Sequence, residues 1–189
     1  TALTGIWAAA DSEDFSSDAN GLLFNKTGSE LLRCPIGYQG TYAVPENVGS
    51  ISVGAFADCV GLRAIILPSG LKSIGDRAFA NCSGLTEFLF PEQVSGIGTS
   101  AFENCTGLTE LLLPEKLVYI EKNTFSGCTA LKNIAMRDHV GYIYDGAFRG
   151  CTALTEIVLP ERLQRINDLA FYDCTSLKNV YFRGDAPSI

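Results

Sequence analysis

The sequence is short of the residues on which metal sites and catalytic centres usually depend. It contains one histidine, His139, and no Cys-x-x-Cys pair. Neither a zinc site nor a Ser–His–Asp or Cys–His catalytic set is therefore recognisable in it. No glycine-rich phosphate loop is present either. We predict no metal site, no cofactor and no enzymatic activity.

Positive charge and long apolar runs are also scarce. The chain has 14 Lys and Arg against 21 Asp and Glu, a formal net charge of −7. Such a surface repels phosphate backbones and anionic lipid headgroups, so we expect no nucleic acid partner and no binding to anionic membranes. No run approaches the roughly 18–20 apolar residues of a membrane helix, so no membrane insertion is expected. The chain begins at Thr1 without an initiator methionine, and we expect it to be a piece of a longer or processed protein.

Internal repetition, by contrast, is abundant. Phenylalanine, cysteine and leucine each recur every 23 residues, and proline keeps the same register. The recurring residues are the phenylalanines at 56, 79, 102, 125, 148 and 171, the cysteines at 59, 82, 105, 128, 151 and 174, the leucines at 62, 85, 108, 131, 154 and 177, and the prolines at 45, 68, 91, 114 and 160. Four residue types in register over more than a hundred positions predict a solenoid.

A single repeat reads as a strand, a corner and a turn. Leu111 and Leu113 are two positions apart, as in a strand with one face inward, and Pro114 ends the strand because it has no N–H. Ile120 belongs to a second, shorter apolar contact, and the segment around Phe102 is expected to turn tightly with its ring inward. One unit cannot bury its own apolar face, so we predict units stacked about 4.8 Å apart.

The repeated cysteines predict a buried column of free thiols. Cysteine is small and mildly apolar, and its S–H is a weak donor for the turn backbone. Disulfides between neighbouring units are disfavoured because side chains in register point the same way, and the spacing fits no metal site. Cys34 lies outside the column. We expect it to fill the core of a hairpin, with a reactive thiol as the alternative.

Residues 62–82, "LRAIILPSGLKSIGDRAFANC", follow the pattern L-x-x-I-x-L-P-x-x-L-x-x-I-G-x-x-A-F-x-x-C. This pattern resembles the BspA-type leucine-rich repeat of bacterial and some protozoan surface proteins. The resemblance implies a β-rich, right-handed leucine-rich-repeat solenoid with a parallel sheet on the concave face, short helical or 3-10 turns and low helix content. It also implies display at the cell surface or outside the cell, no catalysis, and a role in adhesion or in binding host proteins or other cells.

We divide the chain into two parts of one continuous solenoid. Residues 1–44 are expected to contain an N-terminal repeat strand at 3–10 and a β-hairpin insertion that turns at 26–29. Residues 45–189 are expected to hold the tandem 23-residue repeats.

Strand residues that face away from the core form the candidate binding surface. The fifth position of each strand gives a row of apolar and aromatic residues, and the third position gives several glutamates. The candidate residues are Trp7, Ile66, Leu89, Leu112, Val158 and Tyr181 in the row, which also includes Ala135, and Glu87, Glu110 and Glu156 beside it. A contiguous apolar row is typical of an interaction site. Packing between neighbouring strands and self-association remain as alternatives.

These observations favour a domain that binds a protein partner, such as an extracellular-matrix protein or the surface of another cell, through its concave sheet. The alternative is a stalk or spacer with no ligand of its own. The repeat itself sets the spacing of the glutamates, which argues against a glycosidase carboxylate pair. Arg183-Gly184-Asp185 spells the tripeptide that integrins bind, but a match of three letters has little specificity. The oligomeric state is left open.

Overall fold

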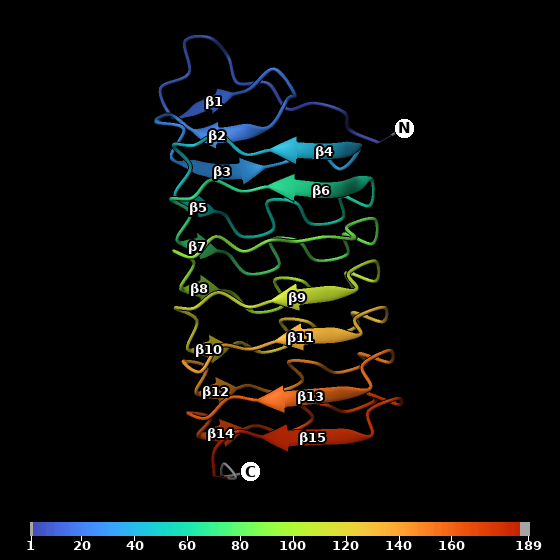
Figure 1. Ribbon diagram of the computed structural model, residues 1–189. Coiled ribbons are helices and arrows are strands. Elements are labelled where there is room, and N and C mark those ends of the chain that lie inside the picture. The colour runs from blue at the N-terminus through green and yellow to red at the C-terminus, as the bar shows by residue number, and fades with distance from the viewer. Residues whose placement is uncertain (1, 186–189) are drawn as a thin grey trace.

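The 23-residue period places one or two short strands and one phenylalanine turn in each repeat, and the coils stack in a single column (Figure 1). A computed structural model describes residues 2–185. It confirms the predicted β-rich solenoid of parallel coils. Within each strand, inward and outward residues alternate, so that Leu111 is buried between the exposed residues Glu110 and Leu112.

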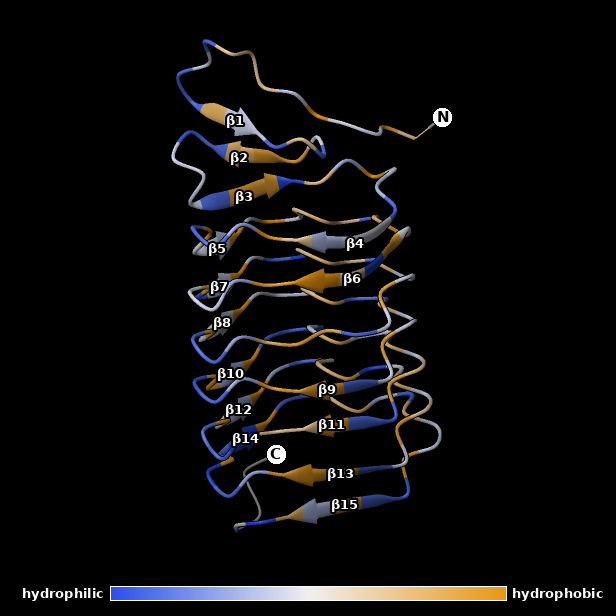
Figure 2. Ribbon diagram, turned by 45° about the horizontal axis from the view of Figure 1, so that its top comes forward, coloured by the Kyte–Doolittle hydropathy of each residue, from blue (hydrophilic) through white to orange (hydrophobic). Residues whose placement is uncertain are grey.

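Two columns of strands run along the stack, joined by hydrophilic corners, and β6 and β13 of the first column are largely hydrophobic (Figure 2). The first strand column consists of β4 (Gly40–Ala43), β6 (Leu62–Ile66), β9 (Glu110–Leu112), β11 (Asn133–Ala135), β13 (Glu156–Leu159) and β15 (Asn179–Phe182). The second strand column consists of β3 (Glu30–Arg33), β5 (Ser50–Ile51), β7 (Ser73–Ile74), β8 (Gly96–Ile97), β10 (Tyr119–Ile120), β12 (Tyr142–Ile143) and β14 (Arg165–Ile166). Where strands of a column pair, the pairing is parallel and joins successive coils. Among the described residues, no ladder joins β6 to β9 or β11 to β13 in the first column, or β8 to β10 in the second.

The repeated phenylalanines form a continuous stack through the core. Neighbouring rings are nearly parallel, with centroids 5.0 Å apart at Phe56–Phe79 and 5.6 Å apart at Phe102–Phe125. Offset stacking of this kind adds roughly 0.5–1.5 kcal/mol for each pair beyond the burial of the rings. The stack joins each coil to the next from Phe56 to Phe171.

The cysteines form the predicted column of buried free thiols. From Cys82 to Cys174, each repeated cysteine donates from Sγ to the phenylalanine carbonyl of the preceding coil, as in Cys105 Sγ to Phe79 O at 3.0 Å. Cys34 is buried beside Cys59 rather than inside the hairpin, and it extends this column at its N-terminal end. A hydrogen bond with Cys59 and burial both raise the pKa of the Cys34 thiol, which argues against a reactive thiolate.

The short helical turns expected around each phenylalanine are not formed, and residues 2–185 contain no helix. These segments are consecutive hydrogen-bonded turns, flanked by residues with positive φ four positions apart. Arg77 (φ 54°) and Asn81 (φ 62°) flank Phe79 in this way. A left-handed residue on each side ends any helix after one turn. Asn81 Nδ2 also donates to Asp58 Oδ1 of the preceding coil at 2.8 Å.

The N-terminal segment departs from the prediction in one respect. The predicted hairpin is present: β2 (Leu23–Asn25) pairs with β1 (Phe15–Ser17) and with β3, both antiparallel, and turns at residues 26–29. The strand expected at residues 3–10 is wrong. Its backbone bonds go to two separate neighbours, Gly37 N to Leu3 O and Ile6 N to Gly21 O, so no continuous ladder forms.

Candidate functional site

The outward residues of the first strand column form an exposed row along the stack. We call Ala43, Ile66, Leu89, Leu112, Ala135, Val158 and Tyr181 the exposed row. Parallel pairing sets its order: Ala43 lies beside Ile66, Leu112 beside Ala135, and Val158 beside Tyr181. Leu89 is the most exposed, with 82% of its surface accessible. The row therefore presents one apolar or aromatic side chain on each of seven successive coils.

Trp7 does not lie in register with the exposed row. It belongs to the N-terminal segment, where its indole ring folds over Gly5: a Cβ at that glycine would lie 2.8 Å from Trp7 Nε1. The residue next to Ile66 is Ala43 of β4. The sequence held a signal for this strand that was missed, because "YAVP" at residues 42–45 matches "IILP" at residues 65–68.

The three glutamates lie beside the exposed row and are themselves exposed. Glu87 and Glu110 occupy adjacent coils, whereas Asn133 separates Glu110 from Glu156. Asn133 Nδ2 donates to Glu110 Oε1 at 3.2 Å. Within residues 2–185, none of the three carboxylates takes part in an ion pair. They give this face an acidic border available to a cationic partner.

The ladder of the first strand column is interrupted at Leu89. Residues 85–90 form no strand, and of their N–H groups only that of Thr86 donates to a neighbouring coil, to Arg63 O at 3.2 Å. In the described chain, the backbone groups of residues 87–90 have no backbone hydrogen bond. Leu89 thus stands on a segment that neither neighbouring coil holds in a ladder.

Two extra aromatic rings explain this interruption. This repeat has Phe88 and Phe90 where the next has Leu111 and Leu113. The Phe88 ring packs 4.7 Å from Phe102 between centroids, and Phe90 packs 5.6 Å from the same ring. Rings of this size need more depth than leucine does, and we attribute the lost pairing of residues 87–90 to them.

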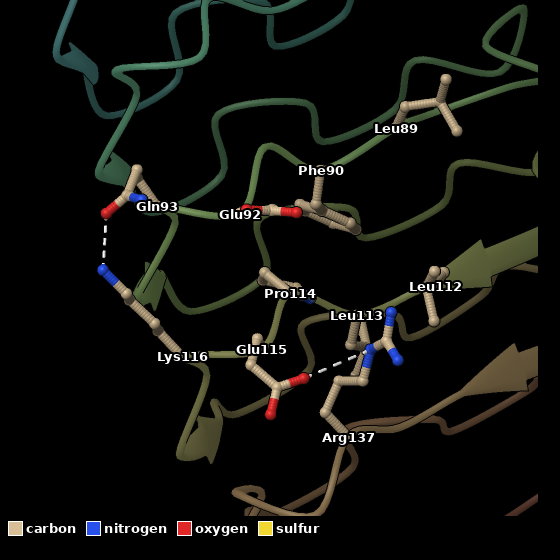
Figure 3. Close-up of a pocket in the computed structure, with 10 residues that line it drawn as sticks. All are labelled: Leu89, Phe90, Glu92, Gln93, Leu112, Leu113, Pro114, Glu115, Lys116 and Arg137. Atoms are coloured by element: carbon tan, nitrogen blue, oxygen red, sulfur yellow. Dashed lines mark hydrogen bonds and ion pairs between the residues drawn. The ribbon is translucent and has the colours of Figure 1, made fainter.

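The unpaired segment, residues 87–90, is flanked by a hollow on each side. One, of about 490 Å³, lies towards Leu112 and Pro114 (Figure 3). The other, of about 710 Å³, lies towards Ile66 and Leu67. Leu89 and Phe90 line both hollows. At this point Leu89 projects from the exposed row, and an apolar hollow lies on either side of it.

Charged groups form the rim of these hollows. In Figure 3, Arg137 reaches over Glu115, with Nε 3.6 Å from Oε2. His139 Nδ1 lies 3.0 Å from Glu115 Oε1, so the single histidine serves in a surface contact. Glu46 and Glu92 line the larger hollow, and in the described part of the chain neither takes part in an ion pair.

The Arg183-Gly184-Asp185 tripeptide is held against the stack. Arg183 Nη1 lies 3.2 Å from Asp138 Oδ1, and Arg183 N donates to Leu159 O. A Cβ at Gly184 would lie only 2.4 Å from Glu161 O, so the glycine sits close against the preceding coil. An integrin-type contact would first have to break the Arg183 ion pair.

Residues 2–185 show no cluster of three or more His, Cys, Asp or Glu side chains placed to hold a metal ion. None of these residues belongs to a helix with the length and apolarity needed to cross a membrane. The face of the exposed row combines exposed apolar side chains, hollows and a charged border.

A solenoid of coils with this leucine, proline, phenylalanine and cysteine register belongs to the leucine-rich-repeat class. The model of the BspA type leucine rich repeat region matches residues 40–128 and 75–189, with six copies. The chain belongs to this BspA-type family, a repeat fold commonly used for protein interaction and typically without enzymatic activity.

Solved structures support the same assignment. The chain resembles a leucine rich cell surface protein of Faecalibacterium prausnitzii, with 28% identity and a TM-score of 0.78 over 94% of this chain and 48% of that one. A leucine-rich repeat protein of Bacteroides ovatus shares 24% identity, with a TM-score of 0.73 over 95% of this chain and 54% of that one. The pneumococcal vaccine antigen PcpA shares 22%, with a TM-score of 0.67 over 98% of this chain and 40% of that one.

The last two likenesses show the fold alone. The chain spans about half the length of the Faecalibacterium prausnitzii protein. A search of curated proteins found no match.

Proposed function

We propose that this domain is displayed at the cell surface or outside the cell and binds a protein partner through the exposed row. The observation that carries the proposal is Leu89, which is 82% exposed and stands between two apolar hollows. A large apolar side chain beside a hollow is typical of the centre of a protein interface. The partner class that fits is a protein of the extracellular matrix or of another cell's surface.

The chemistry of the surface supports a protein partner over a stalk. A row of exposed apolar residues lowers solubility unless a partner covers it. A spacer without a ligand would instead be expected to have a polar face. Within residues 2–185, Glu46 and Glu92 beside the larger hollow form no ion pair. Their carboxylates favour a partner that brings basic side chains to the same place as apolar ones. Similarity to a protein described as a cell surface protein supports the proposed location.

The test is a pull-down from extracellular-matrix and mucosal protein extracts with a triple variant, Leu89→Arg/Leu112→Arg/Val158→Arg. We expect the variant to lose the partner, with an affinity more than about tenfold weaker, because it buries charge at the interface centre. The matched control is Val53→Arg/Val60→Arg/Tyr172→Arg, which adds the same charge at exposed residues outside the exposed row. Circular dichroism must show all three proteins folded.

Each remaining outcome points elsewhere. Equal capture by all three proteins would contradict the proposal and place the site off the exposed row, for example on the N-terminal insertion. No capture by any of them would favour the spacer. Self-association lost only in the Leu89 variant would show that the exposed row meets a second copy of this chain.

A further inference from the structure

Cys34 stands where the later coils have their phenylalanine. In those coils, the N–H of the phenylalanine donates to the residue that precedes the next phenylalanine, as in Phe56 N to Ala78 O at 2.7 Å. Cys34 N makes the equivalent bond to Ala55 O, also at 2.7 Å. The coil of Cys34 therefore carries a thiol at the position that holds a phenylalanine ring in the coils after it.

This placement changes the contacts of Cys59. The later repeated cysteines donate to a phenylalanine carbonyl of the preceding coil, as Cys82 Sγ does to Phe56 O at 3.0 Å. The coil before Cys59 has Cys34 at that position, and Cys59 Sγ lies 4.0 Å from Cys34 O and 3.7 Å from Pro35 O. Cys34 Sγ lies 3.6 Å from the same Pro35 oxygen. Two thiols thus meet at one carbonyl group.

The two thiols are also in contact with one another. Cys34 and Cys59 share a side-chain hydrogen bond, and both are buried. That bond lowers the pKa of the Cys59 thiol, burial opposes the change, and the positive charge of Arg33 lowers the pKa further. The same bond and burial raise the pKa of Cys34. Cys59 is therefore the thiol that ionises first, and Cys34 keeps its proton beside it.

Pairs of repeated cysteines differ from this pair, because both members occupy the same position in their coils and their side chains point the same way. Cys151 and Cys174 also share a side-chain hydrogen bond. Each of them, however, lies within donating distance of a phenylalanine carbonyl, at 3.2 Å and 3.0 Å. A disulfide there would remove both of these donors from buried carbonyl groups. Cys151 and Cys174 therefore serve as the internal comparison for Cys34 and Cys59.

We propose that Cys34 and Cys59 form a disulfide when the domain folds in the presence of a disulfide oxidant. The Cys59 thiolate attacks one sulfur of the oxidant and releases the other as a thiolate. Cys34, on losing its proton, attacks the Cys59 sulfur of this mixed disulfide and releases the second thiolate. Two thiols of the domain are oxidised to one S–S bond. The S–S bond of the oxidant is reduced to two thiols, which take up the two protons.

The bond would hold the N-terminal end of the stack together. Cys34 directly follows β3, near that end in Figure 1, and Cys59 belongs to the next coil. Coils near the end of a solenoid have fewer neighbours than inner coils, and a covalent link also restricts the unfolded chain. Oxidising conditions are expected outside the cell, so the proposal rests on the proposed location but on no protein partner.

The test is refolding of the reduced, urea-unfolded domain in a mixture of reduced and oxidised glutathione, followed by mass spectrometry. Trypsin and a glutamyl endopeptidase together cut at Glu46, between the two cysteines, so a disulfide joins two peptides that are otherwise separate. We expect the Cys34–Cys59 link as the main product, and thiol titration to show the loss of two of the seven thiols. Little link is expected between Cys151 and Cys174.

Two double variants show whether the bond stabilises the fold. The urea midpoint of the oxidised domain should fall when a reductant is added. Cys34→Ala/Cys59→Ala should show no such fall, whereas the matched control Cys82→Ala/Cys105→Ala should keep it. Each protein is compared with itself, so stability lost through the substitutions cancels. Seven free thiols after refolding would overturn the proposal, and so would a main link at any other pair or a midpoint that the reductant does not change.

Discussion

Replacement of Phe102 by alanine is expected to lower the free energy of unfolding by about 3–5 kcal/mol. The ring is fully buried and stacks on Phe79 at 5.2 Å and on Phe125 at 5.6 Å. Phe88 and Phe90 also pack against it, so its removal leaves a cavity that several neighbours line. Urea denaturation followed by circular dichroism would measure the loss.

Leu112→Ala is the matched control for this prediction. Leu112 lies in the following repeat but is half exposed, so its loss should cost less than about 1 kcal/mol. Equal losses for the two variants would show that the phenylalanine stack is not the main bond between coils.

Alkaline pH is expected to destabilise the fold steeply. Burial raises the pKa of the Cys128 thiol from 9.0 to about 12. Burial likewise raises the pKa of Cys105 well above its usual value. Below pH 9 the thiols are protonated in both states and contribute no pH dependence. Above it the unfolded state loses protons that the folded state keeps, so stability falls by about 1.4 kcal/mol per pH unit for each such thiol.

For Cys128 alone, the loss accumulates to about 4 kcal/mol by the time the pH reaches its folded pKa. Cys128→Ala isolates this share, because the variant has one thiol fewer to ionise. Its unfolding free energy would be measured by urea denaturation between about pH 8 and about pH 11, a range that brackets the ordinary pKa of a thiol. We expect it to fall with pH less steeply than that of the unmodified domain, by about 1.4 kcal/mol per pH unit. A variant with the same slope as the unmodified domain would contradict a buried, neutral Cys128.

The repeat could be recognised from the sequence because each repeated residue has the same structural role in every coil. Phe102 and Cys105 recur at a spacing of 23, and a side chain repeated once per coil must form a column. The inward and outward sides of the strands followed from alternation, which holds at Leu111 and Leu112. These features depend on local geometry and on the period, and both are visible in one sequence.

The parts that could not be predicted depend on contacts between coils. In the sequence, Phe88 and Phe90 are indistinguishable from ordinary apolar strand residues. Only the structure shows that their rings pack against Phe102 and that the strand ladder is lost there. Leu3 and Ile6 have strand spacing, but their backbone finds two separate neighbours. The turns were taken for helices because positive φ at a residue such as Arg77 has no signature in sequence.

The interrupted ladder at residues 85–90 has a mechanical consequence. Between this coil and the next, both strand columns lack parallel pairing in the described chain, and the Phe102–Phe125 separation of 5.6 Å is the widest in the phenylalanine stack. Three backbone bonds still cross on the turn side, from Ser100, Phe102 and Asn104. An array of nearest-neighbour units yields first at its weakest junction, so we expect a pull along the axis to part the stack there.

The hollow between Leu89 and Leu112 spans that same junction. A partner bound in this hollow would contact the coils on both sides of the junction and hold them together. Binding of the partner would then also raise the force needed to separate the coils at this junction. The domain would resist mechanical unfolding better when bound than when free.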